Sequence, residues 1–432
     1  MHKTMVSRQQ TITHSPLQDF YQTQTTQSRW SGLLFPDKLL VFSLLLLMLY
    51  GWVMLTSASM PRAGSYGSPF AISLRQGLYM GLGFVIAYAV FMVPSNWWFK
   101  HSYRILLVGF GFLLLVLVPG VGREINGAMR WIPLGIVNIQ ASEFARVCMM
   151  IYAAAYLHRY QNQIHKSLWA MLRLLIVLAV FAVLLLKQPD FGATVVIGAT
   201  VLGMIFLAGV CLVRFVSCSI AVAIVAALVL VAAPYRRARL VSFLDPWEDA
   251  FGSGYQLVQS LIAIGRGETL GVGMGESIQK HHYLPEAHTD FIFSIIAEEL
   301  GLVGVCVLMI LFTIVVWRAF VIASNADKVR MRFASCLAYG IGVWLAIQSL
   351  INMSVATGIL PTKGLTLPMI SFGGSSLLAS FILFALLLRI DSESRYLLAR
   401  QGEVTAKNKA NNQINRQIDR QIDRSGQGMP ND

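Results

Sequence analysis

The sequence predicts an all-α fold, that of a polytopic integral membrane protein with about ten transmembrane helices. Of its 432 residues, 56% are hydrophobic and only 13% are charged, whereas soluble domains carry about 25% charged residues. The mean hydropathy is +0.62, and one soluble core could not bury this much apolar sequence. Apolar runs of about 20 residues, the length that crosses a bilayer, recur along most of the chain.

Ten such runs are long enough to span a membrane. The boundary between the sixth and seventh runs rests on Arg214, and the fourth run is the least hydrophobic because it contains Glu143 and Arg146. The predicted spans cover residues 38–58, 73–93, 104–120, 141–158, 168–187, 191–210, 215–234, 291–317, 332–357 and 370–390.

An even number of spans places both termini on the same side of the membrane. With the termini in the cytoplasm, the short inner loops hold ten Lys and Arg residues and the short outer loops hold six, as the positive-inside rule requires. The net charge of +13 then suits an anionic cytoplasmic leaflet, and nucleic acid is not an expected partner. The orientation predicts a large outer loop, residues 235–290, between the seventh and eighth spans, which we call the periplasmic loop.

The ends of the chain differ in composition from the middle. Residues 1–37 and 396–432 are polar and are predicted to be cytoplasmic tails around a membrane domain of residues 38–395. Within the periplasmic loop, the amphiphilic segment Tyr255–Gly265 predicts a folded cap on the membrane surface. The five cysteines lack CxxC spacing, so neither a disulfide framework nor a zinc site is expected.

The most informative stretch is Leu284–Gly301, a polar loop that continues into an apolar helix. The loop carries Glu286, His288 and Asp290, and the helix carries the pair Glu298–Glu299. At a helical rise of 1.5 Å per residue, that pair lies about 12–13 Å along the axis from Asp290. Carboxylates inside a membrane segment by default mark a functional site.

The alternative for Asp290 is a structural role. Thr289 and Asp290 open the eighth span, where an acid is favoured by unpaired N–H groups and the helix dipole. Against a pure capping role, Thr289 can cap unaided, and several titratable groups crowd one membrane–water border. We therefore favour a functional site around Asp290.

Other polar residues fall on the same predicted side. Arg130 and Trp131 lie near the surface before the fourth span. Glu143 and Arg146 are three residues apart and can pair on one helix face, either as a self-satisfied ion pair or as the wall of a polar cavity. Asp190, after Pro189, can cap the next helix, and capping alone would explain it.

The last outer loop, Thr357–Ser376, adds a cation and small residues. Lys363 is a point charge suited to phosphate. Gly373, Gly374 and the two serines after them can offer backbone N–H groups to an anion, or can simply allow close helix packing. Together these residues predict an outward-facing polar cavity that handles either an amphiphile bearing sugar and diphosphate, or ions and protons.

Several motifs in this order resemble those of the SEDS family (shape, elongation, division and sporulation). The resemblance covers residues 38–395 and is most specific in LPEAHTDFIF followed by EELG. The segment DPWEDAFGSGYQ and the polar N-terminal tail look more like the division members than the elongation members. The other matching motifs are NGAMRWI, QASE, QPDFG, GSGYQLVQSLIAIGRG and LPTKGLTLPMISFGGSS.

The resemblance implies a peptidoglycan glycosyltransferase that polymerises lipid II at the outer face of the inner membrane during septal cell-wall synthesis. By motif position, Asp290 matches the catalytic aspartate of the family, and Glu286, His288 and Thr289 match its neighbours. Lys363 and Ser371–Gly374 match the last outer loop. We assign Arg130, Trp131, Glu143, Arg146 and Asp190 to the same substrate-binding cavity.

This chain departs from the family pattern at three positions. Phe191 stands where Leu is usual, Arg146 where Lys is common, and Phe372 where Tyr is usual. Arg for Lys changes the geometry of phosphate contacts, and Phe372 has no hydroxyl to donate.

The resemblance also implies partners and leaves alternatives. The expected partners are the lipid II substrate, a class B penicillin-binding protein that acts as the division transpeptidase, and other divisome membrane proteins. A divalent cation such as Mg²⁺ is a candidate cofactor. The competing functions are a lipid II flippase and a non-enzymatic scaffold that recruits the transpeptidase.

Overall fold

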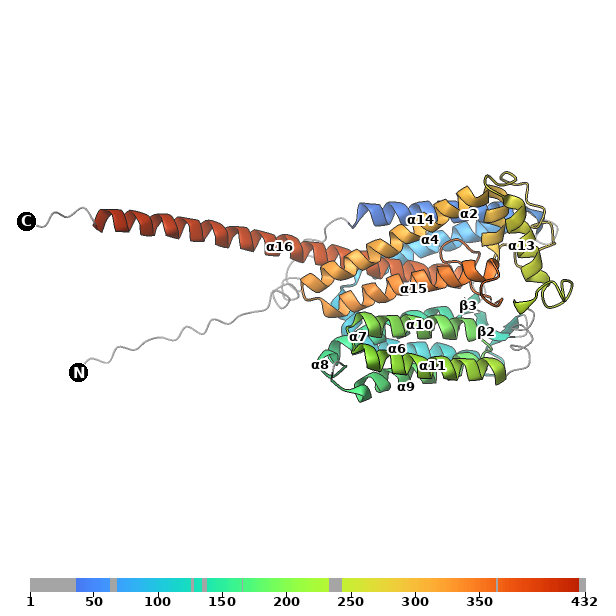
Figure 1. Ribbon diagram of the computed structural model, residues 1–432, viewed down its shortest axis with the longest axis horizontal. Helices are drawn as coiled ribbons and strands as arrows, with labels where there is room; N and C mark the ends of the chain where they lie inside the picture. The colour runs from blue at the N-terminus through green and yellow to red at the C-terminus, as the bar shows by residue number, and fades with distance from the viewer. Residues whose placement is uncertain are drawn as a thin grey trace, which may run out of the picture. The chain divides into compact units, whose positions relative to one another are not determined.

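The computed structural model describes residues 36–62, 68–125, 128–133, 138–164, 166–232, 243–362 and 364–426 (Figure 1). Pro36–Ser394 forms one compact unit, and the residues from Arg395 onward belong to a second. The described residues exclude Lys363, the N-terminal residues 1–35 and the C-terminal residues 427–432.

A helix occupies each of the ten ranges that the sequence predicts as spans. Four short helices connect or cover them: η1 (Met60–Arg62), α5 (Ser95–Lys100), α8 (Gln161–Ile164) and α13 (Tyr255–Gly267). The ten long helices are α2 (Lys38–Ser59), α4 (Ala71–Met92), α6 (Ser102–Val116), α7 (Ala141–Arg159), α9 (Leu168–Lys187), α10 (Phe191–Leu207), α11 (Leu212–Ala232), α14 (Ile292–Lys328), α15 (Arg332–Ala356) and α16 (Gly374–Gly426).

The helices identify a multi-span membrane protein. Seven of those described are long and apolar enough to cross a bilayer. Helices α6 and α10 are shorter, and α7, which carries Glu143 and Arg146, is almost wholly buried by its neighbours. The number of ten crossings therefore stays a prediction.

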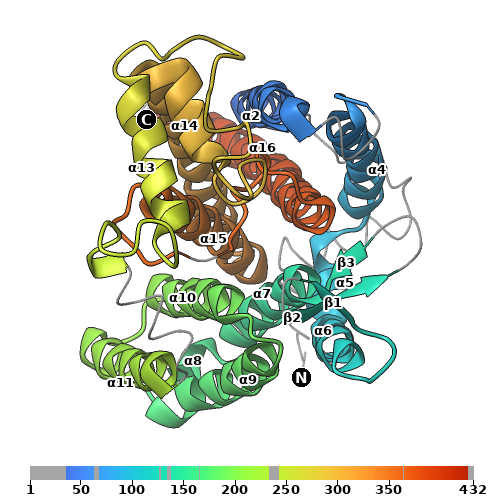
Figure 2. The ribbon, with the colours of Figure 1, turned by 90° about the vertical axis from the view of Figure 1, so that its right-hand side faces the viewer.

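The bundle has a protein-buried interior and a lipid-facing rim. Viewed along their axes, α7, α15 and α16 are flanked by other helices, whereas α11 lies at the edge (Figure 2). Helix α11 exposes a row of large apolar side chains, and 6% of its spanning window is buried. A helix that is apolar all round and exposed needs hydrocarbon around it.

A small antiparallel sheet, which the sequence did not predict, follows α6. Its strands are β1 (Arg123–Ile125), β2 (Ala128–Pro133) and β3 (Asn138–Gln140), in the order β1-β2-β3. Trp131 pairs with Gln140 in the register. The sheet leads directly into α7 and so fixes the entry of that helix into the bundle.

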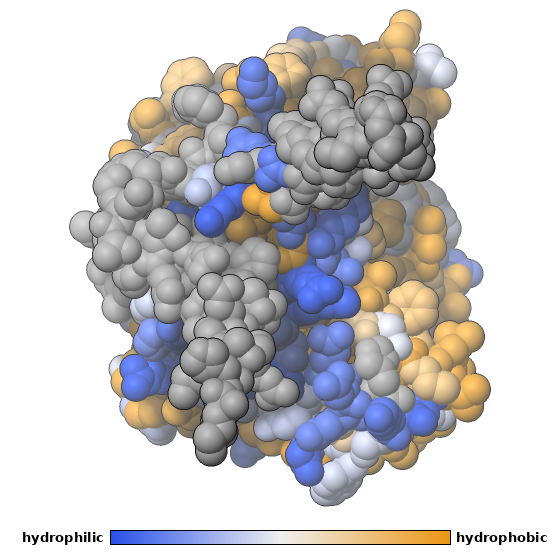
Figure 3. All heavy atoms as spheres, turned by 90° about the vertical axis from the view of Figure 1, so that its left-hand side faces the viewer, coloured by the Kyte–Doolittle hydropathy of each residue, from blue (hydrophilic) through white to orange (hydrophobic). Residues whose placement is uncertain are grey.

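The short elements that connect the long helices lie at both ends of Pro36–Ser394. The strands and α13 lie at one end and α8 at the other (Figure 1). The end that carries α8 shows hydrophilic residues across its middle and hydrophobic residues along its flanks (Figure 3). Polar ends and apolar flanks are what a bilayer-spanning bundle requires.

A buried polar cluster at the α8 end joins the first and last long helices. Asp37 caps α2 by accepting a hydrogen bond from the Leu40 amide (2.8 Å). Its own amide donates to Asp391 Oδ2 in α16 (2.7 Å), and its carboxylate pairs with Arg318 of α14. Residues far apart in the sequence thus meet in one cluster.

Helices α14 and α16 differ from the predicted spans. Helix α14 is kinked at Gly301, where φ is 63° and ψ is −162°. A Cβ there would lie 2.3 Å from the Gly271 amide nitrogen, so both the backbone angle and the space require glycine. Helix α16 continues past the predicted span end at residue 390, through a segment rich in the helix formers Ala, Gln, Lys and Arg.

Candidate functional site

Asp290 lies directly before Phe291, the N-cap residue of α14, and no side chain caps the helix there. Thr289 Oγ1 instead donates to Glu286, to its Oε2 at 2.7 Å and its main-chain oxygen at 3.1 Å. Neither Thr289 nor Asp290 thus occupies the N-cap position of α14, and the Asp290 side chain is partly exposed.

Two contacts fix the surroundings of Asp290. Asn352 of α15 donates from Nδ2 to the main-chain oxygen of Asp290 (2.9 Å) and to that of Leu365 (2.6 Å). Gly364, which precedes Leu365 in that loop, lies close to the Asp290 side chain: a Cβ on Gly364 would be 2.9 Å from Asp290 Oδ2. The last outer loop thus forms one wall around the carboxylate.

His288 ties the same loop to the start of α16. It is 5% exposed, its carbonyl accepts a hydrogen bond from the Phe372 amide (2.9 Å), and the two rings lie 5.9 Å apart. Ser371 Oγ accepts from the Leu367 amide (2.8 Å), so this hydroxyl closes a turn. The segments that hold Asp290 and Ser371 therefore meet.

The Gly-Gly-Ser-Ser run packs closely at the start of α16. A Cβ on Gly374 would lie 2.8 Å from the Tyr79 ring, and one on Gly373 would lie 3.4 Å from Thr366. Ser375 donates to the Asn138 carbonyl (2.9 Å) and accepts from the Gln140 amide (2.9 Å). Close packing accounts for Gly374 and Ser375, and Ser375 attaches the small sheet to α16.

Glu143 and Arg146 form the ion pair that their spacing predicts. Both are buried, at 7% and 4% exposure. Arg146 Nη1 also donates to Gln348 Oε1 (2.6 Å), and its guanidinium lies 4.6 Å from the centroid of the Trp344 ring. This second polar centre is built inside the bundle, where a buried pair persists only when further hydrogen bonds satisfy it.

Asp190 joins this second centre from the α9–α10 turn. It caps α10 through Oδ1, which accepts from the Ala193 amide (3.2 Å), and it is close enough to act electrostatically on both Glu143 and Arg146. Asp190 is 3% exposed, and its Oδ2 has no hydrogen-bond partner in the part of the chain that the structure describes. A buried acceptor without a donor is costly, so this oxygen is available to a ligand.

Arg130 and Trp131 lie beside the same turn, on strand β2. Arg130 donates from Nε to the Gln188 carbonyl (3.1 Å) and from Nη2 to the Pro189 carbonyl. Trp131 is half-buried. The two side chains therefore lie at the end of the bundle that carries the strands (Figure 1). The hydrogen bonds of Arg130 hold the turn that carries Asp190.

No metal-binding cluster accompanies these residues within the described ranges. No three His, Cys, Asp or Glu side chains gather there in a way that could hold an ion. The divalent cation stays a prediction, and no step of the chemistry below depends on it.

A family profile for FtsW, RodA and SpoVE, described as "Cell cycle protein", matches residues 37–396. The chain belongs to this family. "Probable peptidoglycan glycosyltransferase FtsW" of Dichelobacter nodosus is 48% identical over 393 residues, which cover 90% of this chain and 99% of that protein. The protein of the same name from Halomonas elongata is 48% identical over 370 residues, 85% and 93% of the two chains.

Solved structures of the FtsW/RodA/SpoVE family have the same fold. A chain from a peptidoglycan synthase complex, solved to show how polymerization and crosslinking are coordinated, is 29% identical with a TM-score of 0.68 and covers 83% of this chain and 98% of its own length. The rod shape determining protein RodA of Thermus thermophilus is 26% identical with a TM-score of 0.61, and covers 82% and 96%. The resemblance that the motifs predict is confirmed.

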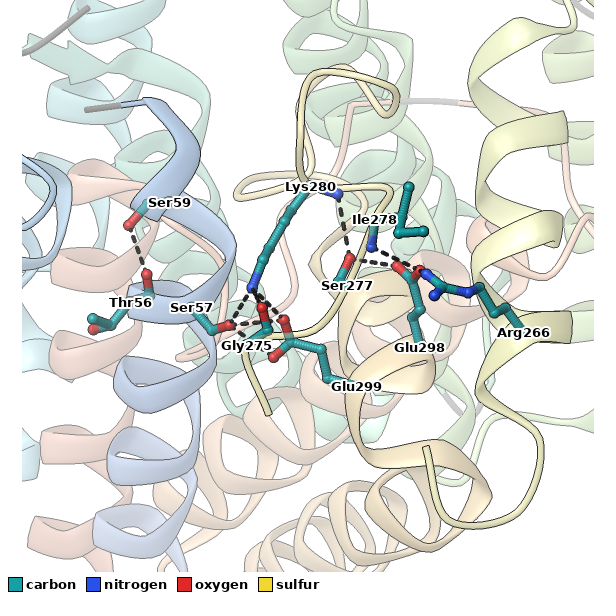
Figure 4. A network of polar contacts seen from close by, with 10 residues as sticks. All are labelled: Thr56, Ser57, Ser59, Arg266, Gly275, Ser277, Ile278, Lys280, Glu298 and Glu299. Carbon is teal, nitrogen blue, oxygen red and sulfur yellow. Dashed lines mark hydrogen bonds and ion pairs between the residues drawn. The ribbon is translucent and has the colours of Figure 1, made fainter. Parts of the chain in front are cut away.

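The buried pair Glu298–Glu299 has a structural explanation in this family member. Both residues are fully buried, and each is paired with a cation from the outer loop (Figure 4). Glu298 pairs with Arg266 (2.9 Å), and Glu299 pairs with Lys280 (2.7 Å) and accepts from Ser57 of α2 (2.7 Å). We name these five residues the outer clamp; it joins the large loop, α2 and α14.

The sequence did not single out Asn352 or Gln348, which hold the two polar centres. Both are buried, at 2% and 0% exposure, and lie four residues apart on α15. The sequence feature that could have identified them is an amide side chain within an apolar span, since polar side chains in membrane helices are rare and usually functional. Which backbone oxygens they bind depends on tertiary structure and cannot be read from their spacing.

Proposed function

We propose that this family member is an inverting peptidoglycan glycosyltransferase that polymerises lipid II, with Asp290 as the catalytic base. The observation that carries the proposal is the placement of Asp290, a partly exposed carboxylate whose backbone is held by Asn352 and whose side chain lies against the loop of Gly364. Support comes from the names of its relatives, which are probable peptidoglycan glycosyltransferases.

The chemistry follows from the weakness of a sugar hydroxyl as a nucleophile. Asp290 accepts the proton of the acceptor GlcNAc 4-OH while that oxygen attacks C1 of the donor MurNAc. The bond between C1 and the diphosphate oxygen breaks, and undecaprenyl diphosphate leaves with the electron pair. A single displacement of this kind inverts the anomeric centre.

The leaving diphosphate needs positive charge near the oxygen that it releases. Our candidates are Arg130 and, from the sequence alone, Lys363, which lies outside the described residues. The Glu143–Arg146 pair with Asp190 would shape the inner wall of the cavity. Glu286, His288, Thr289 and Trp131 would line the same cavity, as would the turn of Ser371, Gly373 and Gly374. Both substrates carry lipid tails, which explains a site at the membrane border.

The test is polymerisation of lipid II by purified protein in detergent. Asp290→Asn should fold and insert normally yet form no glycan strands, because the amide cannot accept the proton. Asp249→Asn is the matched control: this carboxylate lies in the same outer loop, is fully exposed and hydrogen-bonds Ser253, so its variant should polymerise normally. Near-normal turnover by Asp290→Asn would overturn the assignment.

The same assay separates the competing functions. A flippase or a scaffold yields no strands under any condition, and a scaffold also tolerates simultaneous replacement of Asp290, Glu286 and Lys363. A class B penicillin-binding protein of the division machinery is the proposed partner at the septum, because a similar chain forms part of a peptidoglycan synthase complex. The assay is therefore run with and without that transpeptidase.

A further inference from the structure

We propose that Asn352 and Gln348 are positioning residues, an amide pair on α15 that sets the last outer loop against the Asp290 carboxylate. This inference rests on the proposed role of Asp290. Neither amide is assigned to touch substrate; each acts through the backbone that it holds.

The contacts of Asn352 require an amide. Its Nδ2 donates to two carbonyl oxygens from different parts of the chain, that of Asp290 at 2.9 Å and that of Leu365 at 2.6 Å. The NH₂ group of the amide supplies two N–H donors, one for each carbonyl, so the orientation of the amide is fixed by its partners. An aspartate of the same size would instead place an anion against two carbonyl oxygens.

Gln348 repeats this contact one helical turn away. Its Nε2 donates to the Thr366 carbonyl (2.9 Å), and its Oε1 accepts from Arg146 Nη1 (2.6 Å) and from Trp344 Nε1 (2.5 Å). Residues four apart share a helix face. The two amides therefore bind consecutive carbonyls of one loop and join it to both polar centres.

The loop depends on these donors because it has no regular backbone pairing. Residues 364–367 belong to neither a helix nor a strand, and a buried carbonyl outside secondary structure needs a side chain or water to satisfy it. Gly364, next to Leu365, abuts Asp290 Oδ2. A displacement of this loop would therefore move the wall against which the carboxylate stands.

The test measures kcat and KM for lipid II in parallel for wild type, Asn352→Asp, Asn352→Leu, Gln348→Glu and Asp290→Asn. A misplaced base slows the chemical step without weakening binding, and a displacement of about 1 Å can cost about 100-fold in rate. We expect both Asn352 variants to lose about 100-fold in kcat with KM within about twofold of wild type. Gln348→Glu should lose less, because a carboxylate still accepts from Arg146.

Controls separate positioning from folding. Asn325→Asp introduces the same charge near the C-terminal end of α14, the end far from Asp290. Among the described residues, the Asn325 side chain hydrogen-bonds only Lys328, so this variant should keep full kcat. Hydrogen exchange at residues 364–367 should accelerate in the Asn352 variants and not in the control. Of the two Asn352 substitutions, Leu retains apolar packing if Asp prevents folding.

The outcomes distinguish this inference from the function on which it rests. Activity retained by Asp290→Asn overturns the proposed base. An inactive Asp290→Asn together with unchanged kcat in both Asn352 variants overturns the positioning role alone. A loss of kcat that only follows the loss of folded protein, with unchanged hydrogen exchange in the folded fraction, also overturns it.

Discussion

A missing methyl group creates the space beside Asp290. A Cβ on Gly364 would lie 2.9 Å from Asp290 Oδ2. That distance is shorter than ordinary carbon–oxygen contact, and the carboxylate would have to rotate or retreat. Glycine at this position thus leaves room for the neighbouring carboxylate.

We expect Gly364→Ala to lower the rate of lipid II polymerisation by about 100-fold while leaving the protein folded, because the displaced carboxylate no longer reaches the acceptor hydroxyl. Gly265→Ala is the control, since a Cβ on Gly265 of α13 meets nothing within 4 Å. Equal rates for the two variants would show that the contact with Asp290 Oδ2 is unimportant.

For single residues, the sequence predicted contacts between near neighbours in the chain better than it predicted other contacts. The Glu143–Arg146 pair and the Asp190 cap follow from short spacings and are confirmed. The roles of Thr289 and Asp290 at the start of α14 could not be settled from sequence, because the capping residue is decided by backbone angles one position later.

Among the elements, α14 combines a kink with the outer clamp. At the kink, segment 268–273 supplies the backbone partners: the amides of Val272 and Gly273 donate to the carbonyls of Glu298 (3.0 Å) and Glu299 (3.1 Å). The clamp side chains then neutralise both buried acids. A membrane helix tolerates such a break only where protein satisfies the freed backbone groups.

We expect Lys280→Met to lower the free energy of unfolding by about 3–5 kcal/mol, because it leaves the Glu299 carboxylate buried without its cation. The double variant Lys280→Met/Glu299→Gln should recover part of that loss, since no buried charge remains. Denaturant unfolding in detergent micelles measures both.

The half-exposed pair Asp327–Arg332 provides the comparison, because exposed pairs contribute about 0–1 kcal/mol. Replacing Arg332 by Met should therefore have little effect on unfolding. A Lys280→Met variant as stable as Arg332→Met would refute a stabilising clamp.

Hydropathy was sufficient to predict the elements that face lipid, but not those that form through contact. A helix occupies every one of the ten predicted ranges, because each run must satisfy its own backbone in a bilayer. The three strands have three to six residues each, too few for a periodic signal. They depend on partners such as Ser375, 235 residues away from Gln140.

For the whole molecule, the fold of a multi-span membrane protein is confirmed, while the placement of the loops and the orientation in the membrane stay predictions. Ser57, Lys280 and Glu299 meet at one end, and Asp37, Arg318 and Asp391 meet at the other. The charge bias of the loops assigns the first of these ends to the periplasm.

We expect Glu248→Cys, in a chain whose five native cysteines are replaced, to react with a membrane-impermeant maleimide in intact spheroplasts. Lys328→Cys, at the C-terminal end of α14, should react only after the membrane is permeabilised. The reverse pattern would place Asp290 on the cytoplasmic side, away from assembled cell-wall precursor, and would contradict the proposed function.

The cluster of Asp37, Arg318 and Asp391 has a consequence for biogenesis. Its members enter the bilayer at the beginning, late middle and end of translation, and 354 residues separate Asp37 from Asp391. Until the final helix is inserted, the ionised side chains near the cytoplasmic surface lack part of their native partners. A nascent chain stalled before that point lacks the Asp391 carboxylate that accepts from the Asp37 amide, so the cluster is complete only once α16 has been translated.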